Sequence, residues 1–324
     1  ALFLTTGARA EPTAEDFQKV VDEAWAKFKG VKEGANADYI PILATVPSEM
    51  FGVVIATRDG KVYSAGETKY EFSIQSVSKP FTASLIMAEQ GPKTLREKIG
   101  VEPTGMAFNS KLAVELHPER SVNPLVNAGA IAAVSLVEAE NEEQRWDKVH
   151  QNINDYAGRE LKVIDEVYDS EYETAWSNRG IANNLYNYGR LYSEPEEALR
   201  VYTRQCSIGL NTKDLAMMGA TLANEGVNPA TGKRLLPAKD VPELLAIMAT
   251  AGFYDESGEW MYRAGLPAKT GVGGGIVAVV PGKFAIATFS PPLNEAGNSV
   301  RGLMAINYIA GKLGVGLYGP NTGE

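Results

Sequence analysis

The sequence predicts an α/β protein of the α+β type, with an antiparallel sheet flanked by helices and a helical lobe inserted into it. Short apolar hairpins stand near both ends of the chain, at residues 51–65 and 275–289. From about 105 to 255 the pattern is helical, with loops marked by Asn-Pro, Gly and Ser-Glu-Pro. This arrangement indicates one sheet built from sequence-distant halves plus a helical lobe. The cleft between the lobes is the expected binding site.

The elements at the N-terminal end follow from residue spacing. Apolar residues recur at helical intervals over 15–28, and Thr13 is a plausible N-cap. Residues 51–57 are short, β-branched and apolar, which is typical of a buried strand. Arg58-Asp-Gly60 predicts a turn, and residues 61–65 return as the hairpin partner.

The remaining elements close the same sheet. A long apolar helix is expected from about 75 to 89. The second hairpin combines strands at 275–280 and 283–289 around a Pro-Gly turn at 281–282, and an amphipathic helix is expected over 302–313. The expected boundaries are a tail or leader remnant at 1–13, a catalytic domain at 14–315 and a tail at 316–324. Within the domain we expect a mixed α/β lobe at about 14–75 and 256–315 and a helical lobe at about 76–255.

Composition narrows the function classes. The formal net charge of −9 argues against nucleic acid or an anionic membrane surface as the main partner. The single cysteine, Cys206, excludes an internal disulfide and any CxxC motif, and its burial is expected. Only His117 and His150 are present, so a His-rich metal site is excluded and a Ser-His-Asp triad would have to use one of them.

The N-terminal segment leaves the location open. Residues 1–10 form a short apolar stretch ending in a small-x-small pattern before Glu-Pro, as at the end of an export signal, but a basic n-region is missing. We expect a cytoplasmic protein by default and a periplasmic or secreted one if this segment ends a signal. No run approaches the roughly 18 apolar residues that a membrane span needs.

One short pattern suggests nucleophilic catalysis. Ser76-x-x-Lys79 is the only S-x-x-K in the chain. On a helix, positions three apart share a face, so the hydroxyl and the amine lie within reach. Lysine can serve as the base for serine when burial or a nearby cation depresses its pKa. Serine and lysine are common residues, so this spacing also arises by chance. In that case the two side chains simply lie on a solvated helix face.

A second motif strengthens the first. Lys269-Thr270-Gly271 immediately precedes the second hairpin, where penicillin-recognising enzymes place their K-T-G. The glycines at 273–275 precede a strand rather than a helix, so a phosphate cradle is not expected.

Several longer segments resemble the serine-dependent glutaminase family in order and spacing from about residue 14 to 315. They are Ala37–Pro47, Phe72–Lys79, Asn123–Ala130, Val201–Ser207, Leu266–Ile276, Phe289–Asn294 and Gly297–Gly302. The resemblance implies a β-lactamase-like or penicillin-binding-protein-like fold and hydrolysis of L-glutamine to L-glutamate and ammonia. It also implies no metal, no organic cofactor and a homodimer or homotetramer.

The resemblance also assigns roles to residues. Ser76 matches the nucleophile and Lys79 its base. The positions that hold the amino acid are Tyr39, Ser76, Asn127, Glu171, Asn178, Tyr202, Tyr254 and Val272. Glu171 can pair with the substrate α-ammonium, and the amides of Asn127 and Asn178 can bind the α-carboxylate.

The expected mechanism is acyl transfer through a γ-glutamyl-serine ester. The backbone N–H groups of Ser76 and Val272 would form the oxyanion hole. Tyr254 is favoured over Tyr202 as the proton donor to ammonia. Lys269 is a further catalytic candidate that either lowers the pKa of Lys79 or supports the sheet edge.

Two other functions fit part of the pattern. Another acyl-serine enzyme, such as a β-lactamase, D,D-peptidase or esterase, shares both lysine motifs but does not account for the Asn-Ala-Gly-Ala segment or Glu171. A non-catalytic glutamine or glutamate sensor would not need the complete set of reactive groups.

Overall fold

The main sheet of the computed structural model joins strands from opposite ends of the chain. The structure describes residues 11–117, 119 and 121–319, so residues 1–10 of the tail or leader remnant expected at 1–13, and residues 320–324 of the tail expected at 316–324, lie outside the described residues. All neighbouring strands are antiparallel, and β1 pairs with β8 in the centre. The order is β2-β1-β8-β7-β6, with β1 at Gly52–Thr57, β2 at Val62–Gly66, β6 at Ala268–Thr270, β7 at Gly275–Val280 and β8 at Phe284–Phe289. Both predicted hairpins are therefore confirmed.

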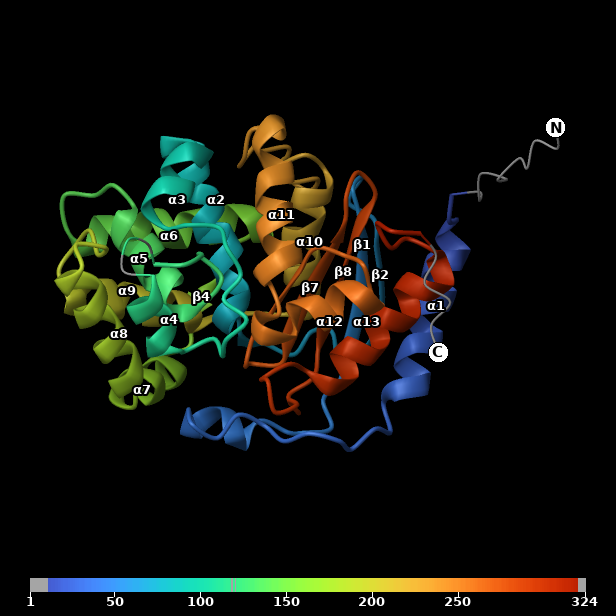
Figure 1. Ribbon diagram of the computed structural model, residues 1–324. Coiled ribbons are helices and arrows are strands. Elements are labelled where there is room, and N and C mark those ends of the chain that lie inside the picture. The colour runs from blue at the N-terminus through green and yellow to red at the C-terminus, as the bar shows by residue number, and fades with distance from the viewer. Residues whose placement is uncertain (1–10, 118, 120, 320–324) are drawn as a thin grey trace, which may run out of the picture.

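Helices cover both faces of this sheet (Figure 1). On one face α1 (Ala14–Phe28) and α13 (Val300–Leu313) pack against residues such as Ile55 and Ile286. On the other face α10 (Thr212–Ala223) packs against β1, β7 and β8. Thr13 caps α1 through a capping box with Asp16, as predicted for the cap. Successive strand residues point to opposite faces of the sheet, so each strand contributes side chains to two separate apolar cores.

The helical lobe packs beside the sheet and forms the other half of Figure 1. A small sheet of order β3-β5-β4 lies where the lobes meet. Helices α11 (Val241–Ala251) and α12 (Ser257–Arg263) connect back to β6. The lobe contains α2 (Lys79–Gln90), α3 (Pro92–Lys98), α4 (Lys111–Leu116), α5 (Asn127–Leu136), α6 (Glu142–Ala157), α7 (Asp165–Glu173), α8 (Trp176–Asn187) and α9 (Pro195–Cys206); the small sheet contains β3 (Phe72–Ser73), β4 (Lys162–Val163) and β5 (Ile208–Leu210).

The chain between α1 and β1 crosses from one lobe to the other. In Figure 1 this segment runs beneath the sheet and ends in the 3-10 helix η1 (Pro41–Thr45) under the helical lobe. The Asn36 amide braces it by donating to the Val46 carbonyl at 2.7 Å, and the Ile42 N–H donates to Ser170 Oγ of α7 at 3.4 Å. The crossing carries Tyr39 to the junction of the lobes.

Three features differ from the sequence expectation. The helix expected over 75–89 is present, but it begins with a 3-10 turn, η2 (Gln75–Ser78), and only then continues as α2 to Gln90, and its first residue, Gln75, takes a positive φ of 49°. The middle of the chain also holds β4 and β5, which are too short to give a periodic signal. Helices α10 and α11 lie within the range expected for the helical lobe, yet they pack on the main sheet.

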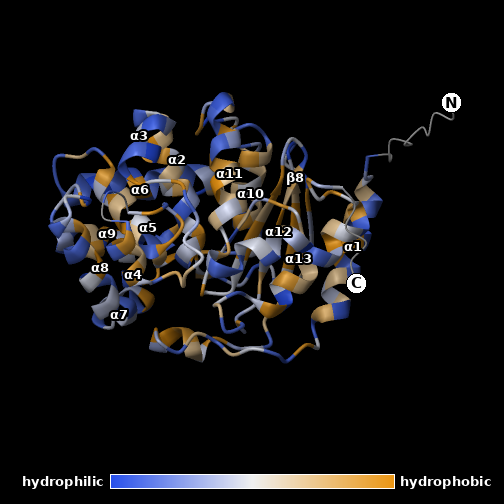
Figure 2. Cartoon of the chain, viewed as in Figure 1, coloured by the Kyte–Doolittle hydropathy of each residue, from blue (hydrophilic) through white to orange (hydrophobic). Residues whose placement is uncertain are grey.

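Apolar residues concentrate between the layers (Figure 2). Cys206 is buried in the larger of the two main cores, as expected for the lone cysteine. None of the helices in the described part of the chain has the length and hydropathy needed to cross a membrane.

Candidate active site

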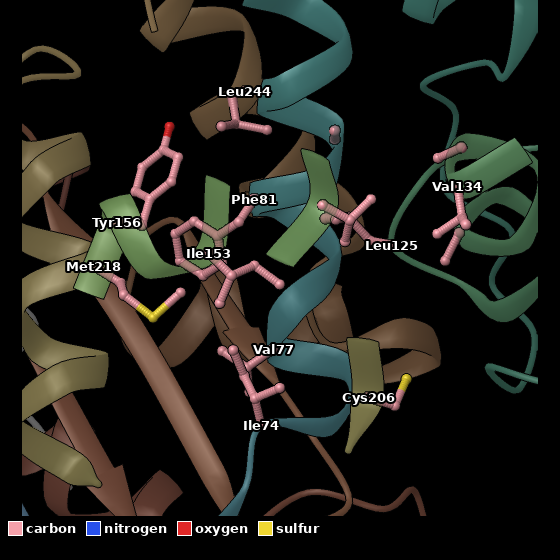
Figure 3. Packing of buried hydrophobic residues seen from close by; sticks show 14 of the residues in the cluster. Ile74, Val77, Phe81, Leu125, Val134, Ile153, Tyr156, Cys206, Met218 and Leu244 are labelled. Atoms are coloured by element: carbon pink, nitrogen blue, oxygen red, sulfur yellow. The ribbon is translucent and has the colours of Figure 1, made fainter. Parts of the chain in front are cut away.

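The turn η2 presents Ser76 at the junction of the lobes. Its neighbours Ile74 and Val77 point into the apolar core at the foot of α2 (Figure 3), which fixes the turn from below. The Ser78 hydroxyl donates to the Gln75 carbonyl at 2.6 Å and closes the turn from within. In 3-10 geometry residues i and i+3 are eclipsed, so Ser76 and Lys79 still share one side of the chain.

Lys79 is a buried amine held by one amide oxygen. Its Nζ donates to Asn127 Oδ1 at 2.6 Å. Burial lowers the pKa of Lys79 to about 8, and the nearby Cys206 and Glu171 act in the opposite direction. A lysine with this pKa is partly neutral near pH 8, so it can accept a proton from a neighbouring hydroxyl.

Tyr254 and Lys269 form the buried wall on the sheet side. Tyr254 takes a positive φ of 58° in the short helix η4 (Tyr254–Glu256), and its hydroxyl lies beside Ser76 and donates to the Thr270 carbonyl at 3.5 Å. Burial raises the pKa of Tyr254, and the neighbouring Ser76 side chain partly offsets that rise. Lys269 Nζ donates to the carbonyls of Gly252 at 3.0 Å and Thr270 at 2.7 Å. Burial, followed by the charge of Lys79, lowers the pKa of Lys269 well below its usual value.

Asn127 joins four helices at one amide. Its Oδ1 accepts from Lys79 of α2 and, at 3.2 Å, from the Tyr202 hydroxyl of α9. Its Nδ2 donates to Asn178 Oδ1 of α8 at 3.0 Å. The position of Asn127 at the start of α5 thus fixes three polar side chains in the same wall of the site.

Glu171 of α7 is an almost fully buried carboxylate. Gln75 Nε2 donates to its Oε2 at 3.1 Å. Burial raises the pKa of Glu171 to about 7, against the hydrogen bond from Gln75 and the charge of Lys79, which both lower it. A buried acid with this pKa carries a charge near neutrality when a cation approaches.

The edge of the main sheet comes close to Ser76 at a glycine. A Cβ on Gly271 would lie 2.9 Å from Val77 Cγ2 and 3.2 Å from the Ser76 nitrogen, which is closer than side chains normally pack. A residue with a Cβ at position 271 would crowd the Ser76 amide, so glycine is needed there for the backbone before Val272 to approach it. The Ser76 N–H stands in the first turn of η2, where backbone donors lack partners within the helix.

Most of the predicted site residues line one pocket. Tyr39, half exposed, stands with its ring 6.2 Å from that of Phe108. Tyr254, Lys79 and Lys269 are buried and do not line the pocket, although Tyr254 and Lys79 contact residues that do. The lining contains Tyr39, Ile40, Gln75, Ser76, Phe108, Asn109, Asn127, Glu171, Thr174, Ala175, Ser177, Asn178, Tyr202 and Val272.

Sequence reasoning missed several lining residues. Gln75 lies beside Ser76 in a segment that carried the resemblance, so adjacency was the available signal. Phe108 and Asn109 come from a loop with no periodic pattern, and nothing in the sequence marks them. Within the described residues, His, Cys, Asp and Glu side chains form no group of three that could hold a metal ion.

The fold and the site define a class first. An antiparallel sheet flanked by helices, with a S-x-x-K turn at the lobe junction and a K-T-G strand beside it, is a β-lactamase-like fold. The sequence profile of the glutaminase family matches residues 34–318. The chain belongs to the glutaminase family, and hydrolysis of glutamine to glutamate is the activity that membership implies.

Similar proteins cover nearly the whole chain. A glutaminase from Colwellia psychrerythraea is 51% identical over 95% of this chain and 99% of its own. A solved structure described as a probable glutaminase is 51% identical, with a TM-score of 0.93 over 94% of this chain and 99% of that one. A probable glutaminase from Bacillus subtilis, complexed with 6-diazo-5-oxo-L-norleucine, is 28% identical with a TM-score of 0.83 over 96% and 98% of the two chains.

Proposed function

We propose that this chain hydrolyses L-glutamine to L-glutamate and ammonia through a γ-glutamyl ester on Ser76. The observation that carries the mechanism is the pairing of a serine with a buried lysine three residues later, whose pKa burial lowers to about 8. A serine hydroxyl needs such a base before it can attack an amide.

The first half-reaction transfers the acyl group. Lys79 takes the Ser76 proton while Oγ attacks the side-chain amide carbon, and the developing oxyanion accepts from the N–H groups of Ser76 and Val272. The C–N bond then breaks as the leaving nitrogen takes a proton, and ammonia departs. In the second half-reaction water loses a proton to Lys79, attacks the ester and releases glutamate with the proton returned to Ser76.

Tyr254 is the proposed donor to the leaving nitrogen. Its hydroxyl lies beside Ser76 and makes a long hydrogen bond, at 3.5 Å, to the Thr270 carbonyl, whereas the Tyr202 hydroxyl donates to Asn127 Oδ1 at 3.2 Å. The Lys79 ammonium reprotonates Tyr254 in turn. Lys269 lies over the Tyr254 ring, and burial and the charge of Lys79 lower its pKa.

The substrate backbone binds on the opposite wall. Glu171 pairs with the α-ammonium, while Asn127, Asn178 and Tyr202 bind the α-carboxylate and Tyr39 covers the pocket mouth. A buried carboxylate is costly unless a cation or hydrogen-bond donors compensate it, which favours a free amino acid over an N-acylated one.

Covalent labelling tests the proposal. We expect 6-diazo-5-oxo-L-norleucine, a glutamine analogue, to modify the chain at Ser76, as located by peptide mass spectrometry. The Ser76→Ala variant should show neither label nor ammonia release. Full turnover by Ser76→Ala would contradict the mechanism, and nitrocefin hydrolysis without ammonia release from glutamine would favour a β-lactamase-type activity.

A further inference from the structure

Gln75, the residue before the nucleophile, has a strained backbone and a fully committed side chain. Its φ of 49° lies in the left-handed region, which residues other than glycine rarely occupy, and only 2% of the residue is exposed. Such strain persists only where the surroundings hold it, and it clusters at functional sites.

The side chain is held by a carboxylate. Gln75 Nε2 donates to Glu171 Oε2 at 3.1 Å and lies 3.4 Å from Ser73 Oγ. Only the NH₂ end of the amide can donate to a carboxylate, so this contact fixes the orientation of the amide. A Cβ on Gly273 would lie 3.3 Å from Gln75 Cγ and 2.5 Å from the Ser73 carbonyl, so this glycine leaves room for both.

The backbone of Gln75 is held separately, by a buried chain of hydrogen bonds from α9. Thr82 Oγ1 donates to Gln205 Oε1 at 2.5 Å, and Gln205 Nε2 donates to Ser78 Oγ at 3.0 Å. Ser78 in turn donates to the Gln75 carbonyl. Two independent sets of contacts therefore hold one strained residue between Ser76 and Glu171.

We propose that Gln75 is a positioning residue for the ammonium subsite, whose amide keeps the Glu171 carboxylate oriented and ionised for the substrate α-ammonium. The inference rests on the proposed role of Glu171. Gln75 acts through that carboxylate and takes no part in bond making or breaking. The strained turn thus serves two tasks, because it brings both Ser76 and the Gln75 amide to the same pocket.

The groups facing Glu171 support this role. Lys79 is the cation near it, and it lies on the nucleophile side. Tyr39, Tyr202 and Cys206 also face it. Burial raises the pKa of Tyr202 and Cys206, and desolvation of its hydroxyl raises that of Tyr39 although half of the residue is exposed, so all three stay neutral and add no charge near pH 7. Gln75 is thus the hydrogen-bond donor that favours the ionised form of Glu171.

Two substitutions separate the amide from the backbone conformation. Gln75→Gly accepts the positive φ but lacks the amide, whereas Gln75→Met keeps the side-chain volume but cannot donate. Because a hydrogen bond to a charged group is lost, we expect both variants to raise KM for glutamine roughly tenfold while kcat changes less than about threefold. The acid limb of the pH profile of kcat/KM should also move to higher pH in both.

The pH profile distinguishes this role from a purely structural one. A KM rise with an unmoved acid limb, or no change in either variant, would overturn the inference. If Gln75→Met does not fold, Gln75→Gly decides the question alone. Glu171→Gln is the comparator: an unchanged KM in that variant would refute the proposed ammonium subsite itself, whereas a raised KM there with normal Gln75 variants would refute only the role of Gln75.

Discussion

Lys269 Nζ lies 3.9 Å from the ring centroid of Tyr254, while Lys79 Nζ lies 5.7 Å from the same centroid. Two buried lysines therefore flank one tyrosine whose hydroxyl reaches Ser76. Because two charges in one apolar site repel, burial and the charge of Lys79 both lower the pKa of Lys269. The Lys269 amine is held by two backbone carbonyls, whereas that of Lys79 is held by the Asn127 amide oxygen.

The first prediction concerns the base. Lys79→Met removes the proton acceptor but keeps much of the side-chain volume, so kcat should fall by at least about 10³-fold, within the range for loss of a general base. Lys79→Arg should be as poor, because a guanidinium does not deprotonate near neutral pH. Stopped assays of ammonia release measure both, and a Lys79→Arg variant with near-normal kcat would contradict the assignment.

The second prediction concerns Lys269. In Lys269→Met the carbonyls of Gly252 and Thr270 lose a buried donor, and each unpaired group costs about 1–3 kcal/mol. We expect the free energy of unfolding, from urea titration, to fall by roughly 2–4 kcal/mol. Lys239→Met, at an exposed position, serves as the control. Unchanged stability in Lys269→Met would contradict the view that this lysine stabilises the sheet edge.

The third prediction is a pH profile with two ascending steps. Glu171 must be ionised to bind an ammonium, and Lys79 must be neutral to act as base, so kcat/KM should rise as the pH passes about 7 and again about 8. Glu171→Gln should abolish the lower step and leave the upper one. A profile that falls with increasing pH over this range would reverse both assignments.

The fourth prediction tests the close approach of the sheet edge. Gly271→Ala would place a Cβ 3.2 Å from the Ser76 nitrogen and 2.9 Å from Val77, so the oxyanion donors must separate. Loss of one such donor typically costs about 10²–10³-fold in kcat. Gly258→Ala is the matched control because no atom lies within 4 Å of the added methyl. Equal activity of the two variants would show that the close approach at Gly271 is not needed for activity.

Sequence reasoning predicted the hairpins, the capped helix and half of the residues that line the candidate pocket, for separate physical reasons. Runs of β-branched residues predict strands such as 275–280, and the side-chain oxygen of Thr13 predicts the N-cap of α1. The resemblance placed Asn127, Glu171 and Asn178, which no local pattern distinguishes from surface residues. The 3-10 first turn of the helix at 75–90 and the positive φ of Gln75 were not predicted, because a single dihedral leaves no trace in residue periodicity. The contacts of Phe108 depend on tertiary packing alone.

The last prediction is that replacing Glu171 stabilises the fold although it removes the proposed ammonium-binding group. Burial raises the folded pKa of Glu171 from 4.5 to about 7, so the folded state binds this proton more tightly than the unfolded chain. Its contribution to stability is therefore fully present below about pH 4.5 and is lost as the pH rises toward 7, because the buried group must then ionise. Glu171→Gln is always neutral, so at pH 8 the variant should be more stable than the parent chain by about 1–3 kcal/mol.

The difference should shrink to nearly zero at pH 4, where both side chains are uncharged. Urea titrations at pH 4, 6 and 8 measure it, with Asp22→Asn on the exposed side of α1 as the control for general charge effects. If Glu171→Gln is less stable than the parent at pH 8, the carboxylate is already compensated in the empty site and does not await a cation. A stability gain accompanied by lost glutamine binding would mean that the site stores free energy in an unpaired charge, which the substrate ammonium releases on binding.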